Sequence, residues 1–542
     1  MERAKLGGDC LWTGCVPTKA LVATARLIHQ MSHADAYGLE PQTVRVTPEA
    51  IMDSMRAQRH AIEHHDDPEK FRALGIDVVF GNATLVSRSE VDVAGRRLVA
   101  KDFVIATGTR TAVPPIEGLA EHGFLDHASF LNQDAFPASL VILGGGAIGI
   151  EFAQMFRRFG SEVVVVEMGE EIINKEDADV IARVRRMLTE EGIVIRTGWS
   201  AKSVRVDGGK KAVRIENALG ETMELRADEI FVASGRRANT ENLGLEAIGV
   251  KTERGFITVD KYLQTSVPRI WACGDVHGGM QFTHVAAYEA VKLVRNMLFP
   301  GRSVVTYDDI PWGLYTDPEV GHIGMTESEA VKKHGVENVR TYSVEMADVD
   351  RAVVDRATTG FLKLVCGKRG RLLGAHALCA NASTLIETLV LARKKKVTVS
   401  QLAQLVSPYP SLADQLQTPA SPYYPDVAKC GLGSVGARPG GVVGRERALH
   451  GTAARLAGAS ARVAARDQKR ATIYRRNSAR SSRGPRGNRS PSHSLDHADR
   501  RRALDRGSSA ISALQFDREE RYRRGFRPRR ATAPALAGNR VA

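Results

Sequence analysis

Residues 139–167 read SLVILGGGAIGIEFAQMFRRFGSEVVVVE. An apolar run leads into the glycine-rich turn Gly144-x-Gly146-x-x-Gly149, which is followed by a helical stretch, a β-branched run and the acidic Glu167. The glycines permit a tight turn and let the backbone approach a pyrophosphate at a helix N-terminus, while the carboxylate can accept from a ribose 2′-hydroxyl. This stretch therefore predicts a Rossmann βαβ unit that binds a dinucleotide. Because Glu167 would repel a 2′-phosphate and no arginine follows it closely, NADH is favoured over NADPH.

Short β-rich runs alternate with helical patterns on both sides of this unit, up to about residue 300. Such alternation predicts parallel sheets with crossover helices. Between roughly 305 and 415 the pattern changes to strands followed by a helical stretch at 383–393, which predicts a separate α+β domain. The predicted strands are 77–80, 103–106, 140–143, 163–167, 229–233, 270–272 and 360–366.

The composition fits a large enzyme with an unusual C-terminal tail. At roughly 150 residues a domain, a chain of 542 residues predicts about three domains. Neither an apolar run of membrane-spanning length nor a signal-peptide pattern is found, so we expect a cytoplasmic protein. The net charge of +14 arises after residue 433, in a Gly-, Ser-, Pro- and Arg-rich stretch that we expect to be disordered. A reading-frame change explains this arginine bias better than a nucleic-acid-binding arm.

Only two of the six cysteines are close neighbours. Residues 7–21 read GGDCLWTGCVPTKAL, with Cys10 and Cys15 five positions apart and Pro17 just beyond. A helix that begins near this loop could bring the two side chains to disulfide distance, and a helix N-terminus stabilises a thiolate. The spacing thus indicates a redox-active pair rather than a structural disulfide framework.

The pattern GGxCxxxGCxPxKAL resembles the redox segment of the class I pyridine nucleotide-disulfide oxidoreductases, the family of dihydrolipoamide dehydrogenase and mercuric reductase. The resemblance implies FAD and NAD(P)H as cofactors. It also implies that Cys15 is the thiol nearest the flavin and Cys10 the interchange thiol that meets the acceptor. Lys19 would lie near the flavin ring, paired with Glu151.

Further segments are similar to the flavin-site signatures of this family. They are the turn that closes FVIATG and the stretch TSVPRIWACGDV at 265–276. A family member begins with a strand, a first GxGxxG turn and a second strand, whereas here Glu2 stands at the terminal acid of that unit. We therefore expect an FAD-binding part that lacks its first βαβ unit and binds FAD weakly or not at all. The cofactor-binding residues that the resemblance implies, beyond those named above, are Glu2, Gly7, Gly8, Ala106, Thr107, Gly108, Gly235, Gly274 and Asp275.

Residues 311–327 and 351–382 resemble the C-terminal dimerisation domain of the family, which implies a homodimer. In PYPSLAD, at 408–414, Tyr409 stands where the family has an acid/base histidine, and Asp414 where it has a glutamate. A phenol is a poor base near neutral pH. Tyrosine is typical of mercuric reductases, but those also end in a cysteine pair, and this chain offers only Cys430 there. The acceptor is therefore left open between a disulfide and a metal ion.

The sequence gives no further metal-ligand pattern, and we expect no resident metal. His284 and His376 lie in apolar stretches and are expected to be hydrogen-bonded core residues. The expected fold class is α/β, with two Rossmann-like nucleotide-binding domains, the FAD part incomplete, and an α+β dimerisation domain. The predicted parts are 1–118 (FAD, first part), 119–255 (NAD(P)), 256–300 (FAD, second part), 301–430 (dimerisation) and 434–542 (disordered basic tail).

The predicted function is an FAD-dependent oxidoreductase that passes electrons from NAD(P)H through flavin and the cysteine pair to a disulfide or metal-ion acceptor. One alternative is an NAD(P)H quinone or dye reductase of the same fold. Another is an inactive fragment with an Arg-rich nucleic-acid-binding tail. We expect no membrane partner, and binding of nucleic acid by the tail is not favoured.

Overall fold

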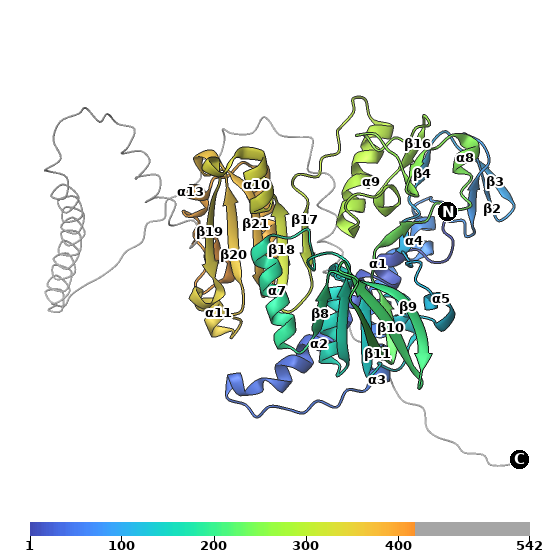
Figure 1. Cartoon of the computed structure of the whole chain (residues 1–542). Coiled ribbons are helices and arrows are strands. Elements are labelled where there is room, and N and C mark those ends of the chain that lie inside the picture. Colours follow the sequence, from blue (N-terminus) through green and yellow to red (C-terminus); the bar gives the residue numbers. More distant parts are fainter. Residues whose placement is uncertain (418–542) are drawn as a thin grey trace, which may run out of the picture. The chain divides into compact units, whose positions relative to one another are not determined.

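The computed structural model describes residues 1–417 of the chain (Figure 1). The predicted basic tail at 434–542 and Cys430 lie outside the described residues. The expected fold class is confirmed, with nucleotide-binding α/β parts and a C-terminal dimerisation domain. The predicted boundaries between the parts stay predictions.

Residues 139–167 form the centre of a four-stranded parallel sheet in the order β12-β6-β7-β8. β6 is buried along its whole length, as expected for a central parallel strand covered on both faces. α6 follows β6 directly, so the predicted strand, turn, helix and strand are all confirmed. The bounds are β6 (Ser139–Leu143), α6 (Ala147–Arg158), β7 (Glu162–Glu167), α7 (Ala178–Glu190), β8 (Val194–Thr197) and β12 (Glu229–Val232).

A three-stranded antiparallel sheet in the order β11-β10-β9 extends this nucleotide-binding part. A phenylalanine cluster packs α6 against the parallel sheet, with Phe152 and Phe231 ring centroids 4.5 Å apart. Phe130 and Phe156 complete the cluster in edge-to-face geometry, an arrangement that adds stability beyond area burial. The bounds are β9 (Trp199–Asp207), β10 (Lys210–Asn217), β11 (Thr222–Ala227), α5 (Leu119–His122), β13 (Arg236–Ala238) and α8 (Leu245–Ile248).

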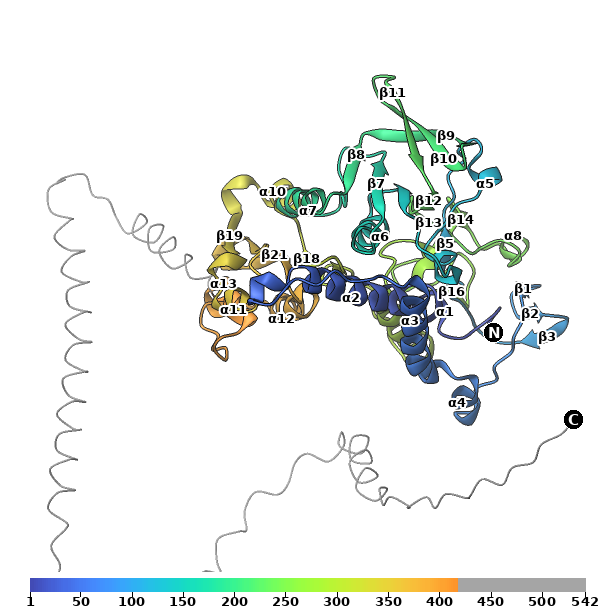
Figure 2. The ribbon, with the colours of Figure 1, turned by 90° about the horizontal axis from the view of Figure 1, so that it is seen from below.

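The part that the sequence assigns to flavin contains helices from the beginning of the chain and short strands. α2 and α3 pack against each other and are seen along their length in Figure 2. β4 pairs in parallel with β16, although about 165 residues separate them. The bounds are α1 (Gly8–Trp12), α2 (Cys15–Ser32), α3 (Pro48–Glu63), α4 (Pro68–Ala73), β1 (Ala83–Leu85), β2 (Glu90–Val93), β3 (Arg96–Val99), β4 (Phe103–Ile105), β5 (Thr109–Thr111), β14 (Thr252–Glu253), β15 (Phe256–Ile257), β16 (Ile270–Ala272) and α9 (Thr283–Leu298).

The strand predicted at 77–80 is wrong. Only an isolated parallel bridge between Glu2 and Phe80 forms there, supported by a hydrogen bond from the Glu2 amide to the Val79 carbonyl. A β-rich run becomes a strand only when a neighbouring strand satisfies its backbone groups along several residues. Here the described neighbour pairs at a single position, so the segment stays a loop.

The dimerisation domain contains a five-stranded antiparallel sheet in the order β17-β18-β21-β20-β19. β20 and β21 are buried at every position, because α12 packs on one face and α7 of the nucleotide-binding part contacts the other. The predicted strand at 360–366 and helix at 383–393 are confirmed within one residue at each end. The bounds are β17 (Pro311–Leu314), β18 (Glu319–Gly324), α10 (Glu327–His334), β19 (Arg340–Glu345), α11 (Asp350–Val354), β20 (Phe361–Cys366), β21 (Leu372–Cys379), α12 (Ala382–Lys394) and α13 (Val399–Leu402).

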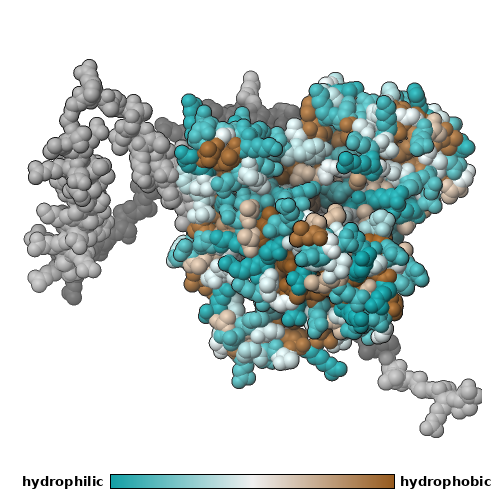
Figure 3. Space-filling model, in the orientation of Figure 1, coloured by the Kyte–Doolittle hydropathy of each residue, from teal (hydrophilic) through white to brown (hydrophobic). Residues whose placement is uncertain are grey.

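On the face shown in Figure 3, hydrophobic residues are scattered among hydrophilic ones. None of the helices within residues 1–417 combines the length and the apolar character needed to cross a membrane.

Candidate active site

The two redox cysteines lie on two consecutive helices rather than on one. Cys10 is in the short α1, and Cys15 is the first residue of α2. Gly14 lies at the break between the helices, where an added Cβ would approach the Asp9 carbonyl to 3.0 Å. Pro17 fits the first turn of α2 because the amides of that turn have no partner within the helix. The loop therefore places Cys15 at the positive end of an 18-residue helix.

Cys10 and Cys15 are both free thiols in the structure, and the Cys15 sulfur lies 3.2 Å from the Thr283 hydroxyl. The hydrogen bond from Cys10 lowers the pKa of Cys15 to about 6, helped by Thr283 and by the charge of Lys19. The same hydrogen bond raises the pKa of Cys10, and burial adds to that rise. At neutral pH the reduced pair therefore consists of a Cys15 thiolate and a Cys10 thiol.

The expected pairing of Lys19 with Glu151 is confirmed. The Lys19 ammonium donates to Glu151 Oε2 at 2.7 Å, and the other Glu151 oxygen accepts from the Tyr315 amide at 2.8 Å. Burial lowers the pKa of Lys19, but the Glu151 carboxylate outweighs burial, so the net shift is upward. A fixed positive charge thus stands next to the Cys15 thiolate, joining α2 to α6 of the nucleotide-binding part.

A polar network connects the redox loop to the predicted flavin-site segments. Asp9, next to Cys10, accepts from Arg236 at 2.6 Å and lies 3.1 Å from His127 Nε2. Arg236 also donates to the Thr109 hydroxyl, which in turn donates to Asp275 at 2.8 Å. Burial raises the pKa of Asp9, but the His127 hydrogen bond and the Arg236 charge outweigh it and lower the pKa well below the usual range. Asp9 is therefore a permanent anion that fixes the loop.

Three of the glycines implied for flavin each border open space. Gly8, Gly108 and Gly235 have positive φ values, and a Cβ added to any of them would meet no protein atom within 4 Å. Gly274 also has a positive φ, and its amide donates to Glu289. The Thr107 hydroxyl donates to the Asn239 carbonyl, which fixes the turn after Ala106. Cys15 is exposed toward solvent here, so these residues fit a flavin placed against the thiol.

The glycines of residues 144–149 fit a dinucleotide. A Cβ on Gly144 would lie 2.4 Å from the Ala233 carbonyl oxygen, and one on Gly149 would lie 2.0 Å from the Gly144 carbonyl oxygen. Gly146, the N-cap of α6, borders open space where a pyrophosphate could meet the helix N-terminus. Glu167 ends β7 and accepts from the amides of Gly145 and Gly169, which leaves further lone pairs for a ribose hydroxyl.

Two implied residues near the N-terminus have backbone roles. Gly7 is the N-cap of α1 with a φ of 93°, and an added Cβ would clash with the Leu11 side chain at 2.6 Å. The Glu2 side chain accepts from the Ala4 amide, while its main chain bonds to Val79 and Gly81. Glu2 is thus placed beside the loop that begins the redox segment.

The dimerisation-domain residues Tyr409 and Asp414 have local partners. The Tyr409 side chain is exposed, and its hydroxyl donates to Asp350 at 2.8 Å. That hydrogen bond raises the pKa of Tyr409. The Asp414 carboxylate accepts from the Ser411 amide in a capping box at the start of a short 3-10 helix. Neither of these hydrogen bonds is made with the redox segment of the same chain.

A family model described as pyridine nucleotide-disulphide oxidoreductase matches residues 2–290, and a model of the dimerisation domain of the same group matches residues 310–420. The chain belongs to this family. It is 33% identical to a mercuric reductase of Bacillus cereus over 435 residues, covering 79% of this chain and 68% of the relative. It is 34% identical to a mercuric reductase of Streptomyces lividans over 440 residues, covering 79% and 91%.

Dihydrolipoyl dehydrogenases are similar to nearly the same degree. The enzyme of Zymomonas mobilis subsp. mobilis is 32% identical over 429 residues, covering 77% of this chain and 90% of the relative. Among solved structures, the HOCl-induced flavoprotein disulfide reductase RclA from Escherichia coli matches with a TM-score of 0.68 and 28% identity, covering 77% of this chain and 92% of that chain. A Cu(II) complex of RclA matches with a TM-score of 0.67.

As a pyridine nucleotide-disulphide oxidoreductase, the chain is an NAD(P)H-dependent oxidoreductase of a family that uses FAD. Its dimerisation domain indicates a homodimer. The glycine turns and the Lys19–Glu151 pair are compatible with these cofactors on the geometry given above.

Sequence reasoning missed several polar residues of this oxidoreductase's redox site. The position of Asp9, a carboxylate next to a thiol in a glycine-rich loop, could have marked it as a site residue. The residues that contact the redox segment from elsewhere in the chain have no such local feature. His127, Arg236 and Thr283 lie more than 100 residues from the redox segment, and only the fold brings them to it.

Of the two histidines predicted to be core residues, one is buried and the other is exposed. His376 is fully buried and both of its ring nitrogens have partners, as predicted for a core residue. His284 is exposed, so its assignment to the core is wrong. It is the second residue of α9, and its Nε2 lies 2.7 Å from the Pro311 carbonyl oxygen. The sequence showed no metal-ligand pattern at Glu176, His322 and His376, which the fold gathers into one buried cluster, and the expectation of no resident metal stays a prediction.

Proposed function

We propose that this oxidoreductase uses NADH to reduce a thiophilic metal ion, with Cys10 and Cys15 as the redox-active pair and a homodimer as the working unit. The single observation that carries the proposal is the asymmetric dithiol at the start of α2. Cys15 is the first residue of α2 and contacts the Thr283 hydroxyl, and hydrogen bonding with Cys10 lowers the pKa of Cys15 to about 6. A pair with one thiolate and one thiol is suited to both electron transfer and capture of a soft ion.

The chain's own groups determine the proton balance of the pair. When the Cys10–Cys15 disulfide takes up two electrons, the S–S bond breaks and one proton is bound. Cys10 takes that proton because its pKa is raised, while Lys19 and Thr283 hold Cys15 as the thiolate. Bound FAD supplies the chemistry that links the two-electron oxidation of NADH to this dithiol.

Tyr409 favours a metal ion over a disulfide as the acceptor. Reduction of a disulfide substrate requires a proton donor for the departing thiolate and a base for Cys10. A phenol whose pKa is raised by Asp350 remains protonated and cannot act as that base at neutral pH. Reduction of a divalent ion to the metal by NADH yields NAD⁺ and one proton, and it needs no protonated leaving group.

The preference for NADH rests on Glu167. Its carboxylate lies at the end of β7 and is fixed by the amides of Gly145 and Gly169. A 2′-phosphate placed near it would meet an anion with no compensating side chain among residues 168–171. A ribose with a free 2′-hydroxyl would gain a hydrogen bond instead.

Turnover of the FAD-loaded full chain with three acceptors tests the proposal. We expect NADH oxidation with Hg²⁺ to exceed that with oxidised lipoamide by at least about tenfold, a difference of about 1.4 kcal/mol in the barrier. Cys10→Ser should abolish Hg²⁺ reduction, because the second sulfur of the pair is lost. Cys379→Ala is the control, since it removes a buried thiol in the dimerisation domain.

The third acceptor, a quinone, separates this proposal from a quinone or dye reductase of the same fold. Direct transfer from flavin to quinone does not use Cys10, so such an enzyme would keep its main activity in Cys10→Ser. A wild-type chain that turns over quinone but not Hg²⁺, and whose rate is unchanged in Cys10→Ser, would contradict the proposal.

A further inference from the structure

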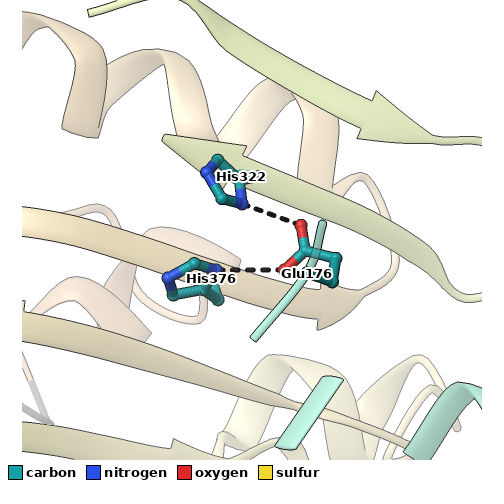
Figure 4. A group of neighbouring side chains, drawn as sticks. All are labelled: Glu176, His322 and His376. Carbon is teal, nitrogen blue, oxygen red and sulfur yellow. Dashed lines mark hydrogen bonds and ion pairs between the residues drawn. The ribbon is translucent and has the colours of Figure 1, made fainter. Parts of the chain in front are cut away.

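Glu176, His322 and His376 form a buried cluster outside the redox motif (Figure 4). His322 on β18 and His376 on β21 are opposite each other in the antiparallel register. Glu176 precedes α7 in the nucleotide-binding part, and each of its carboxylate oxygens faces one imidazole. His322 Nδ1 lies 2.8 Å from Oε1, and His376 Nδ1 lies 3.1 Å from Oε2. The cluster therefore joins the nucleotide-binding part to the dimerisation sheet.

The hydrogen-bond partner of Nε2 in each imidazole determines which ring nitrogen carries a hydrogen. His322 Nε2 lies 2.9 Å from the Gly324 carbonyl, and His376 Nε2 lies 3.1 Å from the Met325 carbonyl. A carbonyl oxygen has no hydrogen to give, so each Nε2 must carry one. The Glu176 carboxylate then contacts each Nδ1 either through a proton on that nitrogen or through one metal ion bound by all three side chains.

The three side chains are each less than a tenth exposed, so the cluster is closed to bulk water. The neighbouring Asp177 carboxylate accepts from Lys363 at 2.9 Å and from the Glu327 amide at 2.9 Å. Two imidazoles and one carboxylate are a donor set that zinc binds in proteins.

We propose that Glu176, His322 and His376 bind one divalent transition-metal ion of the zinc type. The ion would take three protein ligands, namely Nδ1 of His322, Nδ1 of His376 and the Glu176 carboxylate. One donor atom from each residue lies within 4.8 Å of the others, and the nitrogen–oxygen separations are 2.8 and 3.1 Å. The donors of a tetrahedral zinc ion lie about 3.3 Å apart, so small side-chain adjustments would suffice to bind it.

The surroundings of the cluster are those of a metal site. Histidines that bind metals donate their other N–H to a carbonyl or carboxylate, which fixes the ring and its tautomer. Both imidazoles do so here, through Gly324 and Met325. The Trp312 ring also stacks on His322 at a centroid distance of 4.7 Å and holds its plane. The ion would act as a structural link between two parts of the chain, separate from the redox chemistry.

Zinc binding by the full chain tests this site. The chain is produced in zinc-supplemented cells with Cys10→Ser and Cys15→Ser, so that the redox thiols cannot hold the ion. We expect one zinc per chain to remain after dialysis against a weak chelator. Glu176→Gln keeps the shape of the side chain but removes the negative charge, and it should lower zinc affinity at least about tenfold. His334→Gln, an exposed histidine at the end of α10, is the matched control and should retain the zinc.

X-ray absorption at the zinc edge keeps the proposal testable if the Glu176→Gln chain fails to fold. The proposal predicts two imidazole nitrogens at about 2.0 Å plus carboxylate oxygen, with no sulfur. Retention of equal zinc by a folded Glu176→Gln chain, a sulfur shell, or no zinc in the parent chain would each overturn the site. The last result would leave the cluster as an ion pair held by protons, and none of these outcomes alters the Hg²⁺ reductase test.

Discussion

Cys15 is the residue on which the chemistry depends, and its thiolate is stabilised by groups from three separate segments. Cys10 donates from α1, Thr283 contacts it from the start of α9, and Lys19 adds its charge from within α2. The Thr283 and Lys19 contributions do not depend on Cys10, so each can be removed without changing the sulfur pair.

Replacement of Lys19 is expected to raise the pKa of Cys15. Loss of a nearby positive charge should move it from about 6 to about 7. Lys19→Met together with Glu151→Gln avoids leaving the buried carboxylate unpaired. The measurement is the pH dependence of alkylation of the reduced chain by iodoacetamide. Lys70→Met, an exposed lysine on α4, should leave the midpoint unchanged. An unchanged midpoint in the double variant would show that Lys19 does not stabilise the thiolate.

Asp9 gives a prediction about stability and pH. The pKa of Asp9 is lower in the folded chain than its ordinary value of 3.8, so its charge stabilises the fold above about pH 4. This contribution is lost as the pH falls through the folded-state pKa. Because the side chain is 39% exposed, we expect Asp9→Asn to cost only about 1 kcal/mol at pH 7. Denaturant unfolding at pH 7 and pH 3 should show the difference from wild type shrinking in acid. A difference that grows in acid would contradict this account.

At the scale of elements, the segment from the β6–α6 turn into α6 contains glycines with different roles. Gly149 is required for packing of the fold, whereas Gly146 is required for binding of the ligand. Gly149→Ala would place a Cβ 2.0 Å from the Gly144 carbonyl oxygen, and it should destabilise the domain by about 1–3 kcal/mol. Gly146→Ala meets no protein atom within 4 Å, so it should fold normally. Its methyl group would instead crowd the pyrophosphate path and weaken NADH binding at least about tenfold.

Thermal unfolding and NADH titration of the two variants check this division. A folded Gly146→Ala chain that binds NADH as tightly as wild type would show that the pyrophosphate does not pass this helix terminus.

The elements show which parts of the fold were predictable. β6, α6 and β7 follow one another within 29 residues, and their apolar periodicity and glycine spacing are local, so residues 139–167 were read correctly. The run at 77–80 has the same β-rich character, but its state depends on a neighbouring strand that the local sequence does not specify. Element type follows from local pattern, whereas strand formation also requires a partner.

At the scale of the whole described chain, the nucleotide-binding part is joined to the dimerisation sheet by ion pairs, of which the Lys363–Asp177 pair is buried. Lys363 on β20 bonds to Asp177 and Asp179 of the nucleotide-binding part, and also to Glu327 of α10. Arg183 on α7 donates two hydrogen bonds to the Glu345 carboxylate at the end of β19. Such contacts resist relative motion of the two parts.

Removal of Lys363 tests this connection. Lys363→Met would leave the buried Asp177 carboxylate without its cation, and it should cost about 3 kcal/mol. Denaturant unfolding should show a lower midpoint than in wild type, while the exposed Lys368→Met control should be unaffected. A Lys363→Met chain as stable as wild type would show that water or other groups compensate Asp177.

The sequence separation between site residues explains why only part of each site could be predicted. Cys10, Cys15, Lys19 and Gly144 lie inside short motifs, so their grouping could be read directly. The Asp9 network and the Glu176 cluster bring together residues separated by 100 to 230 positions. No local pattern marks His127, Arg236 or His322 as neighbours of those carboxylates, and their roles depend on tertiary packing.

Anaerobic titration of the FAD-loaded chain with NADH tests the central claim most directly, because it counts the electrons that the protein accepts. A flavin and a disulfide each take two electrons, so we predict four for wild type and two for Cys15→Ser. Uptake of only two electrons by wild type, with both cysteines oxidised at the start, would show that Cys10 and Cys15 do not exchange electrons with the flavin.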